Sequence, residues 1–275
     1  MSQWRLVPIT KIDSNRWDAC VRAHRRDVFS EFWYWSTVCS SWQAWIKGDY
    51  DDVIALPAER KWGIIPFMRT PLYVKWLEGD QVQLQYLIQS FFGFRRIHVR
   101  FEMKGAGKRS LQRMKLDAEW NPSRELAKNV RKAESENPEF ISSVQWSEFS
   151  IFMKHNHPYQ WPSVQQHVMQ KLFERAVERG VGEIAGVKMH GQWAAMQFYI
   201  FDNSRSYLVQ NAVSSEWRNR EPMPFLLHTL FRQWQEQCAL VSVNFMGSNN
   251  PGVARFNEKF GAETTHYWEF PRGQG

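Results

Sequence analysis

The sequence predicts a mixed α/β protein built from two domains of similar organisation. At 275 residues the chain has room for two domains of ordinary size. Residues 183–213 contain three strand-like runs joined by short turns, which predicts an antiparallel meander. A strand–helix–strand step follows the meander and implies a locally parallel pair. Together these features predict a mixed sheet with helices packed on it.

The first half of the chain predicts two helices, three strands, a helix and a strand. Each of the two opening helical segments places aromatic or aliphatic residues on one face. The segment Gly48-Asp49-Tyr50 makes the first turn of the meander that follows. The expected elements are helices at 14–26 and 29–40, strands within 42–73, a helix at 80–92 and a strand at 94–103.

The second half predicts a helix, three strands, and then helix, strand, helix and strand. Gly180 is a natural residue to end the first helix, and Pro222 suits the first turn of the second. Asn249 or Asn250 can cap the third helix, which Gly261 ends. The expected elements are helices at 163–180, 222–238 and 251–260, and strands at 183–189, 193–201, 206–213, 239–246 and 263–270.

The similar succession of elements in the two halves predicts a duplicated domain, although the halves show no evident sequence identity. We expect domains at 1–110 and 111–275, the second including a basic linking helix at 122–136. The join is expected within 104–122, where the segment KGAGKRS is rich in Gly and Lys.

Composition describes a globular protein with a positive charge. The chain is 43% hydrophobic and 23% charged, and 35 Lys and Arg against 28 Asp and Glu leave a net charge of +7. This charge suits acidic small molecules, nucleic acid or anionic lipid head groups without choosing among them. The 15 Trp and 19 Phe predict aromatic-rich cores in preference to aromatic-lined clefts.

Cysteine usage and the absence of long apolar runs favour a soluble, cytoplasmic protein. Cys20, Cys39 and Cys238 are odd in number, widely spaced and without a CxxC pair, which argues against a disulfide framework or a zinc–thiolate site. The opening segment MSQWRLVPITKID lacks the apolar run of a signal peptide. No run approaches the ~20 apolar residues that span a bilayer.

Two segments resemble a known family. The segment VNFMGSNNPGVARFNEKFGAE (243–263) and the helix RELAKNVRKAE (124–134) are similar to patterns of the GNAT acyltransferase superfamily, in its two-domain FemAB-like branch. The order of elements in the second half is also that of a GNAT domain. The resemblance therefore implies tandem GNAT-like domains in an α/β (α+β mixed-sheet) fold.

The resemblance also implies where a donor would bind. In GNAT folds the fourth and fifth strands splay apart, donor amides pair with the exposed strand, and the diphosphate of CoA sits at the next helix N-terminus. Here the opening would lie between 206–213 and 240–246, with the phosphate position at 215–225. The implied donor-binding residues are Gln210, Asn211, Arg218, Arg220, Gly247, Ser248 and Asn249.

This sequence departs from the usual acetyl-CoA pattern in two ways. No Gly lies between Ser214 and Phe225, and Pro222 and Pro224 have no N–H to donate to a diphosphate. Asn257 stands where a Tyr often protonates the departing thiolate, and a carboxamide cannot act as a general acid. Both departures favour aminoacyl-tRNA over acyl-CoA as the donor, with no permanently bound cofactor expected.

The linking helix carries the best anion site. Arg124, Lys128 and Arg131 recur at i, i+4 and i+7 and form one stripe, with Lys132 beside it. The stripe is either a solvated basic face or a contact for the phosphates of tRNA or of a nucleotide-linked acceptor.

Three further pairs of residues leave alternatives open. Gly247 and Ser248 follow a central strand, where ligands collect in open α/β sheets, but a tight turn with a helix cap also explains them. Gln210 and Asn211 either face water at a strand edge or line a cleft. His155 and His157 form an HxH pair, for which a polar loop is a better explanation than a metal site.

Two functions follow from these observations. The first is a FemAB-like N-acyltransferase that joins an acyl or aminoacyl group to an amine, with Glu183 or a relayed water as the general base. The second is a catalytically silent GNAT-fold protein that binds an acidic ligand or a partner chain, since fold alone does not imply catalysis.

Overall fold

The structure is a computed structural model in which two compact units are distinguished. It describes residues 3–39, 41–61, 65–68, 77–90, 92–94, 97–157, 163–202, 204–237 and 242–270. Unit 1 comprises Met1–Arg109 together with the residues from His266 on, and unit 2 comprises Ser110–Thr265. The predicted second domain ran to residue 275. The end of the chain is instead grouped with unit 1 because residues 268–270 pair with residues 97–99.

Unit 1 contains the predicted helices and a meander that is divided between two small sheets. One sheet has the order β1-β2-β3 and the other β4-β5-β6, with β5 and β6 parallel. β1 was not predicted from the sequence. The elements are β1 (Trp4–Val7), α1 (Ser14–Ala23), α2 (Phe32–Val38), β2 (Gln43–Lys47), β3 (Asp52–Leu56), β4 (Ala58–Lys61), β5 (Ile65–Met68), α3 (Gln81–Ser90), β6 (Phe92–Phe94) and β7 (Ile97–Val99).

The core of unit 1 is rich in aromatic residues, as the composition predicted. Trp17 is 1% exposed and meets Trp42 edge to face at 5.3 Å between ring centroids. Its indole N–H donates to the carbonyl of Ser30 at 3.0 Å, which satisfies its polar atom inside the core. Asp13 begins α1 by accepting the backbone N–H groups of Asn15 and Arg16.

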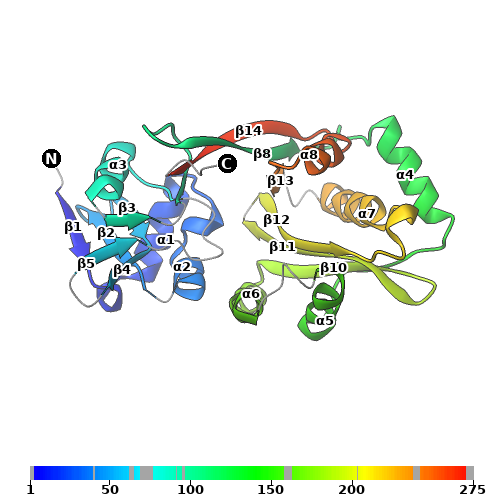
Figure 1. The fold of residues 1–275 in the computed structure, drawn as a ribbon, viewed down its shortest axis with the longest axis horizontal. Coiled ribbons are helices and arrows are strands. Elements are labelled where there is room, and N and C mark those ends of the chain that lie inside the picture. The colour runs from blue at the N-terminus through cyan, green and yellow to red at the C-terminus, as the bar shows by residue number, and fades with distance from the viewer. Residues whose placement is uncertain are drawn as a thin grey trace. The chain divides into compact units, whose positions relative to one another are not determined.

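Unit 2 is a mixed sheet with helices on both faces (Figure 1). Its strand order is β8-β13-β12-β11-β10-β9, with β14 next to β8, and β12 and β13 run parallel. Figure 1 shows α4 and α7 on one face of this sheet and α5 and α6 on the other. The elements are β8 (Gly107–Lys115), α4 (Arg124–Glu134), β9 (Glu139–Ile141), α5 (Trp146–Asn156), α6 (Ser163–Glu178), β10 (Gly182–Met189), β11 (Gln192–Asp202), β12 (Arg205–Val213), α7 (Pro222–Glu236), β13 (Ser242–Gly247), α8 (Pro251–Glu258) and β14 (Glu263–Phe270).

The expected join within 104–122 contains a strand. Residues 111–115 of β8 pair antiparallel with β13, so the Gly- and Lys-rich segment opens a nine-residue strand. Leu111 and Met114 are buried there, which anchors β8 to the sheet. The elements β9 and α5 were also absent from the prediction, whereas each helix and strand expected between 163 and 270 has a counterpart. Residues 239–241 of the expected strand 239–246 lie outside the described residues.

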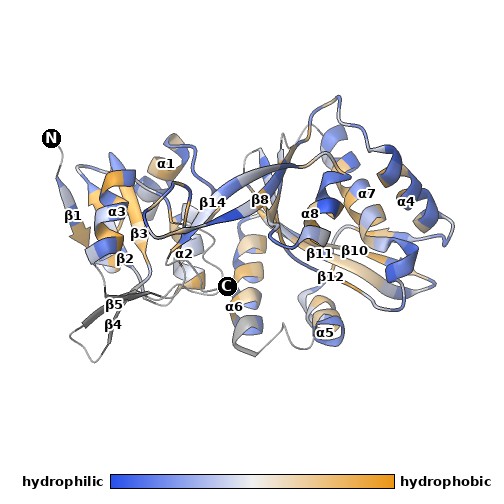
Figure 2. Cartoon of the chain, turned by 45° about the horizontal axis from the view of Figure 1, so that its top comes forward, coloured by the Kyte–Doolittle hydropathy of each residue, from blue (hydrophilic) through white to orange (hydrophobic). Residues whose placement is uncertain are grey.

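α4 is the amphipathic basic helix that the sequence predicted. Leu126, Val130 and Ala133 are buried against the core. The side-chain oxygen of Ser123 accepts the Leu126 N–H at 3.1 Å and caps the helix. Figure 2 shows α4 as a largely hydrophilic helix next to α7, which agrees with an apolar stripe turned to the core. Among the described residues, none of the helices combines the length and apolar character that crossing a membrane requires.

Candidate functional site

The unit 2 sheet opens between β12 and β13. Their parallel pairing joins Arg205–Tyr207 to Ser242–Asn244, and within the described residues no pair continues past Tyr207 and Asn244. The predicted opening between 206–213 and 240–246 is therefore confirmed. Beyond residue 207, the edge of β12 that faces β13 carries backbone groups to which a ligand amide could bind.

A bulge in β12 lies where the opening begins. Leu208 pairs with Tyr199 and Gln210 with Phe198, so Val209 is an extra residue opposite the neighbouring strand. A bulge of this kind bends a strand and increases its twist. Because Val209 is an extra residue, the side chains of Leu208 and Asn211 lie on the same face of the sheet, and both line the opening.

β13 carries a second bulge on the other side of the opening. Asn244 pairs with Arg113 and Met246 with Gln112, which leaves Phe245 as the extra residue. The Asn244 side-chain oxygen accepts the Met246 N–H at 2.8 Å, and Met246 adopts a left-handed φ of 64°. This local bond holds β13 in a bent conformation, so both strands that border the opening are bent.

A cleft of about 620 Å³ occupies the opening. This volume lies within the range of sites that hold small molecules or cofactors. Its apolar walls include Leu208, Val213, Met223, Leu227, Phe245 and Phe256. Its polar groups are His157, Asn211, Arg218, Glu221, Asn250 and Asn257. The cleft can therefore hold a partly apolar group whose polar end meets amides and charged side chains.

The N-terminus of α7 borders the cleft but offers few donors to a diphosphate. Pro222 and Pro224 lack N–H groups, and the Phe225 N–H donates to the Glu221 carbonyl at 3.3 Å. Among residues 222–225, only the Met223 N–H is left to face a ligand. Glu221 also places a carboxylate at this helix end, where it interacts with the helix dipole and repels phosphate.

His157, which was interpreted from the sequence as part of a polar loop with His155, is a cleft residue. It follows α5, a helix that was not predicted, and it lines the cleft while His155 is exposed on the helix. Partial burial and the nearby charge of Arg218 both hold the pKa of His157 below its ordinary value of 6.5. The imidazole is therefore neutral at pH 7 and able to accept a proton.

This low pKa predicts a specific pH dependence. The folded state favours neutral His157, so its contribution to stability is present above pH 6.5 and is lost as the pH falls through the lower folded pKa. We expect imidazole NMR signals of His157 to titrate below pH 6.5, and Arg218→Gln to raise that midpoint. Lys171→Gln on helix α6, at an exposed residue that does not line the cleft, is the control. A midpoint at or above 6.5 in the unaltered chain would contradict the assignment.

The predicted donor-binding residues divide into two groups. Asn211 and Arg218 line the cleft. Gln210 is half-buried, and its carbonyl accepts the side-chain N–H of Gln197 at 3.1 Å. Arg220 pairs instead with Glu136 at 3.0 Å. Of these residues, the cleft thus brings together Asn211 and Arg218.

The turn after β13 is held by backbone bonds. The Ser248 N–H donates to the Ser110 carbonyl at 3.0 Å, and the Asn249 side-chain oxygen accepts the Ser110 N–H at 2.9 Å. Asn250 caps α8 by accepting the Gly252 N–H at 2.8 Å, and it also lines the cleft. Gly247 pairs with Leu111 of β8. These contacts favour a structural turn, and not a ligand contact, for residues 247–249. Asn250 both caps α8 and lines the cleft.

Asn257 and Glu183 have different surroundings. Asn257 is 3% exposed, lines the cleft, and its amide donates to Gln112 at 2.9 Å, so its orientation is fixed. Glu183, the predicted general base, lies on β10, outside the cleft lining, and accepts the Tyr199 hydroxyl at 2.7 Å. Burial and this bond raise the pKa of Tyr199, so the hydroxyl stays protonated and keeps donating to Glu183.

One group of three possible metal ligands occurs among the described residues. The ligand atoms of Cys20, His24 and Asp52 in unit 1 lie within 4.8 Å of one another. Asp52, however, already binds the guanidinium of Arg26, and its second oxygen accepts the Asp80 N–H at 3.0 Å. Burial raises the pKa of the Cys20 thiol, which disfavours the thiolate that a metal needs. The cluster is therefore a poor metal site.

Comparisons with known proteins agree with this geometry. Residues 127–252 match the acetyltransferase (GNAT) domain family, while no curated protein matches the chain. The crystal structure of FemX is similar with a TM-score of 0.68 and 12% identity over 97% of each chain. L-PGS from Bacillus licheniformis gives 0.59 and 12% over 94% of this chain and 91% of that one. A tandem GNAT protein from the clavulanic acid biosynthesis pathway gives 0.58 and 11% over 97% of each chain.

At these identities the likeness to the solved structures shows the fold alone. Residues 127–252, which lie within unit 2, match the acetyltransferase (GNAT) domain family, and the chain has the fold of FemX and the tandem GNAT proteins.

Proposed function

We propose that the chain is a FemAB-like N-acyltransferase that moves an acyl or aminoacyl group from an activated donor to an amine. The observation that carries the proposal is the opening between β12 and β13, with its cleft of about 620 Å³. An acyl chain fits against the apolar walls, and the free edge of β12 suits the amides of a donor.

In the proposed reaction the amine nitrogen attacks the acyl carbonyl carbon. A C–N bond forms, the bond from that carbon to the donor oxygen or sulfur breaks, and one proton leaves the nitrogen while the departing atom gains one. We assign proton acceptance to His157, which lines the cleft with a pKa below 6.5. General bases contribute about 10²–10⁴-fold to rate, and most of the remainder comes from positioning.

The cleft favours an aminoacyl ester over a CoA thioester as the donor. Two prolines and the Glu221 carboxylate disfavour a diphosphate at the N-terminus of α7. The same carboxylate suits the ammonium group of an aminoacyl donor. FemX and L-PGS are two proteins whose structures this chain resembles. An aminoacyl-tRNA donor for this chain is our inference from the cleft.

A ligand panel tests the proposal. We expect a stable aminoacyl-RNA analogue to raise the melting temperature, and acetyl-CoA to have a smaller effect. Val253, which is 43% exposed and lines the cleft, provides a blocking variant, Val253→Trp, that should abolish the shift. Val177→Trp at a similarly exposed site on α6 is the matched control. No shift and no transfer from any donor would leave the silent binding protein as the better description.

A second experiment measures RNA binding by the stripe of basic side chains on α4. Arg124, Lys128, Arg131 and Lys132 are exposed and make no ion pair within the described residues. We expect Arg131→Glu to weaken RNA binding and reduce its salt dependence, with the melting temperature nearly unchanged. Lys171→Glu on α6 makes the same charge change away from α4. A large loss of stability in Arg131→Glu would show instead that the stripe is structural.

A further inference from the structure

The turn before α7 presents side chains in two directions. Arg218 and Glu221 of this turn line the cleft. Trp217 and Arg220 lie outside the cleft lining and contact other parts of unit 2. The Arg220 N–H donates to the Trp217 carbonyl at 2.8 Å, a local bond that shapes the turn without fixing it against the rest of unit 2. We call residues 217–221 the cleft turn.

Glu136, just past the end of α4, binds the cleft turn to a second turn. Its Oε1 accepts a hydrogen bond from the guanidinium of Arg220 at 3.0 Å. Its Oε2 accepts one from Nε2 of His190 at 3.1 Å, in the two-residue turn between β10 and β11. The Glu136 side chain is 18% exposed, and each of its oxygens has a partner from a different segment. One carboxylate therefore joins the end of α4, the cleft turn and the β10–β11 turn.

His190 occupies a backbone position that suits few residues. Its φ of 49° and the φ of 79° at Gly191 are both left-handed, as a two-residue hairpin turn of type I′ requires. Asn is a preferred residue at the first of these positions. The imidazole of His190 lies nearly parallel to the ring of Trp217, with 5.3 Å between centroids and 8° between planes. The histidine therefore adds a ring contact to the cleft turn that an asparagine could not make.

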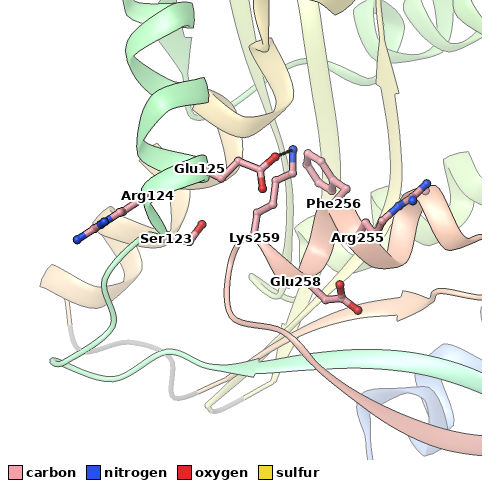
Figure 3. Close-up of a pocket in the computed structure, with 8 residues that line it drawn as sticks. Ser123, Arg124, Glu125, Arg255, Phe256, Glu258 and Lys259 are labelled. Carbon is pink, nitrogen blue, oxygen red and sulfur yellow. Dashed lines mark ion pairs between the residues drawn. The ribbon is translucent and has the colours of Figure 1, made fainter.

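α4 gives Glu136 a fixed position. The Glu136 N–H donates to the Ala133 carbonyl at 3.0 Å, and Leu126 and Ala133 are buried against the core. At the other end of α4, Glu125 pairs with Lys259 at the end of α8, with 2.8 Å between nitrogen and oxygen. Figure 3 shows this pair at the wall of a pocket between α4 and α8. Contacts at both ends and along the buried face thus hold the helix from which Glu136 extends.

From these contacts we infer that Glu136 is a positioning residue for the cleft, which acts by holding the cleft turn. Because the outer side chains of this turn are bound elsewhere, Arg218 and Glu221 are directed into the cleft. The inference rests on the proposed function for the roles of these two residues, which are to keep His157 neutral and to bind the ammonium group of an aminoacyl donor. The position of the turn itself does not depend on that function.

The titration of His157, followed by its imidazole NMR signals, tests the inference without any substrate. In Glu136→Ala the cleft turn is released and Arg218 moves away, so the midpoint should rise by roughly half or more of the rise in Arg218→Gln. In the double variant the two rises should not add, because both remove the same charge from the imidazole. The direct effect of losing a carboxylate has the opposite sign, since a nearby anion raises the pKa of an imidazole. A rise therefore reports movement of the cleft turn.

A second variant and a control make the test specific. His190→Asn removes the ring contact and the bond to Glu136 but suits the left-handed backbone, so the hairpin turn is kept and the His157 midpoint should again rise. Glu134→Ala removes a carboxylate at an exposed position of α4 and should not raise the midpoint. Since the partners of Glu136 are more than half exposed, the melting temperatures of all variants should stay nearly unchanged.

The outcomes separate this inference from the proposed function. A midpoint that rises in Glu136→Ala, while the unaltered chain transfers no acyl group from any donor, supports the positioning role and overturns the transferase. A midpoint that is unchanged or lower in folded Glu136→Ala overturns the positioning role, and transfer by the unaltered chain would still support the transferase. A lower melting temperature without a rise of the midpoint would show that Glu136 is structural only, and would also overturn the inference.

Discussion

Replacing Phe231 with alanine is expected to lower the free energy of unfolding of unit 2 by about 3–5 kcal/mol. The side chain is fully buried on α7, and its ring lies 5.5–5.9 Å from those of four other aromatic residues. Its removal leaves a cavity that these rigid rings cannot fill by rotation. The four residues are Trp120, Trp234, Phe245 and Phe260.

The same variant should disturb ligand binding, because Phe245 lines the cleft and loses its edge-to-face partner. Chemical denaturation followed by tryptophan fluorescence measures the stability loss. Phe231→Leu retains most of the volume and should cost less than half as much. Ile151→Ala on α5 removes an apolar side chain that is 71% exposed, and should change stability by no more than about 0.5 kcal/mol. Equal effects from Phe231→Ala and Ile151→Ala would contradict this account of the core.

The elements of unit 2 from 163 onward could be predicted because local signals and tertiary packing agree there. Turns, prolines and apolar spacing mark each helix and strand, and the residues Leu226, Leu230 and Trp234 of α7 are buried at helical spacing. The opening between β12 and β13 came from the family resemblance. The bulges at Val209 and Phe245 that accompany it depend on neighbouring strands, and no local pattern indicates them.

The missed elements have separate physical explanations. β8 begins in a Gly- and Lys-rich segment that is typical of a linker, and its strand conformation depends on pairing with β13 about 130 residues away. α5 did carry a signal, since Phe149, Phe152 and Met153 are buried at helical spacing. Missing α5 also meant missing His157, whose place in the cleft follows from the end of that helix.

The choice between Asn249 and Asn250 illustrates a limit of local reasoning. Both residues suit a helix cap equally well in sequence. Asn249 is instead bound to the Ser110 N–H of β8, and this leaves Asn250 to cap α8. A contact across 139 positions thus decides which side chain reaches the cleft.

Replacing Asp52 with alanine is expected to destabilise unit 1 by about 3–5 kcal/mol. Asp52 binds Arg26 in an ion pair whose side chains are 10% and 9% exposed, so its loss leaves a nearly buried guanidinium without its anion. Asp52 also accepts the backbone N–H groups of Val53 at 2.7 Å and Asp80 at 3.0 Å. The single carboxylate therefore joins the segment after α1, the start of β3 and the turn before α3.

Asp49→Ala is the matched control in the same unit. Asp49 pairs with Arg16 at 2.5 Å, but the two side chains are 81% and 44% exposed, and solvent-exposed pairs contribute about 0–1 kcal/mol. Asp52→Asn should give an intermediate loss, because the amide oxygen can still accept a backbone N–H while Arg26 loses its counter-charge. Denaturant unfolding measures the stability loss of each variant, which should be largest for Asp52→Ala, intermediate for Asp52→Asn and smallest for Asp49→Ala. If Asp52→Ala were as stable as Asp49→Ala, Arg26 would have to escape to water, and burial would not be what makes this pair important.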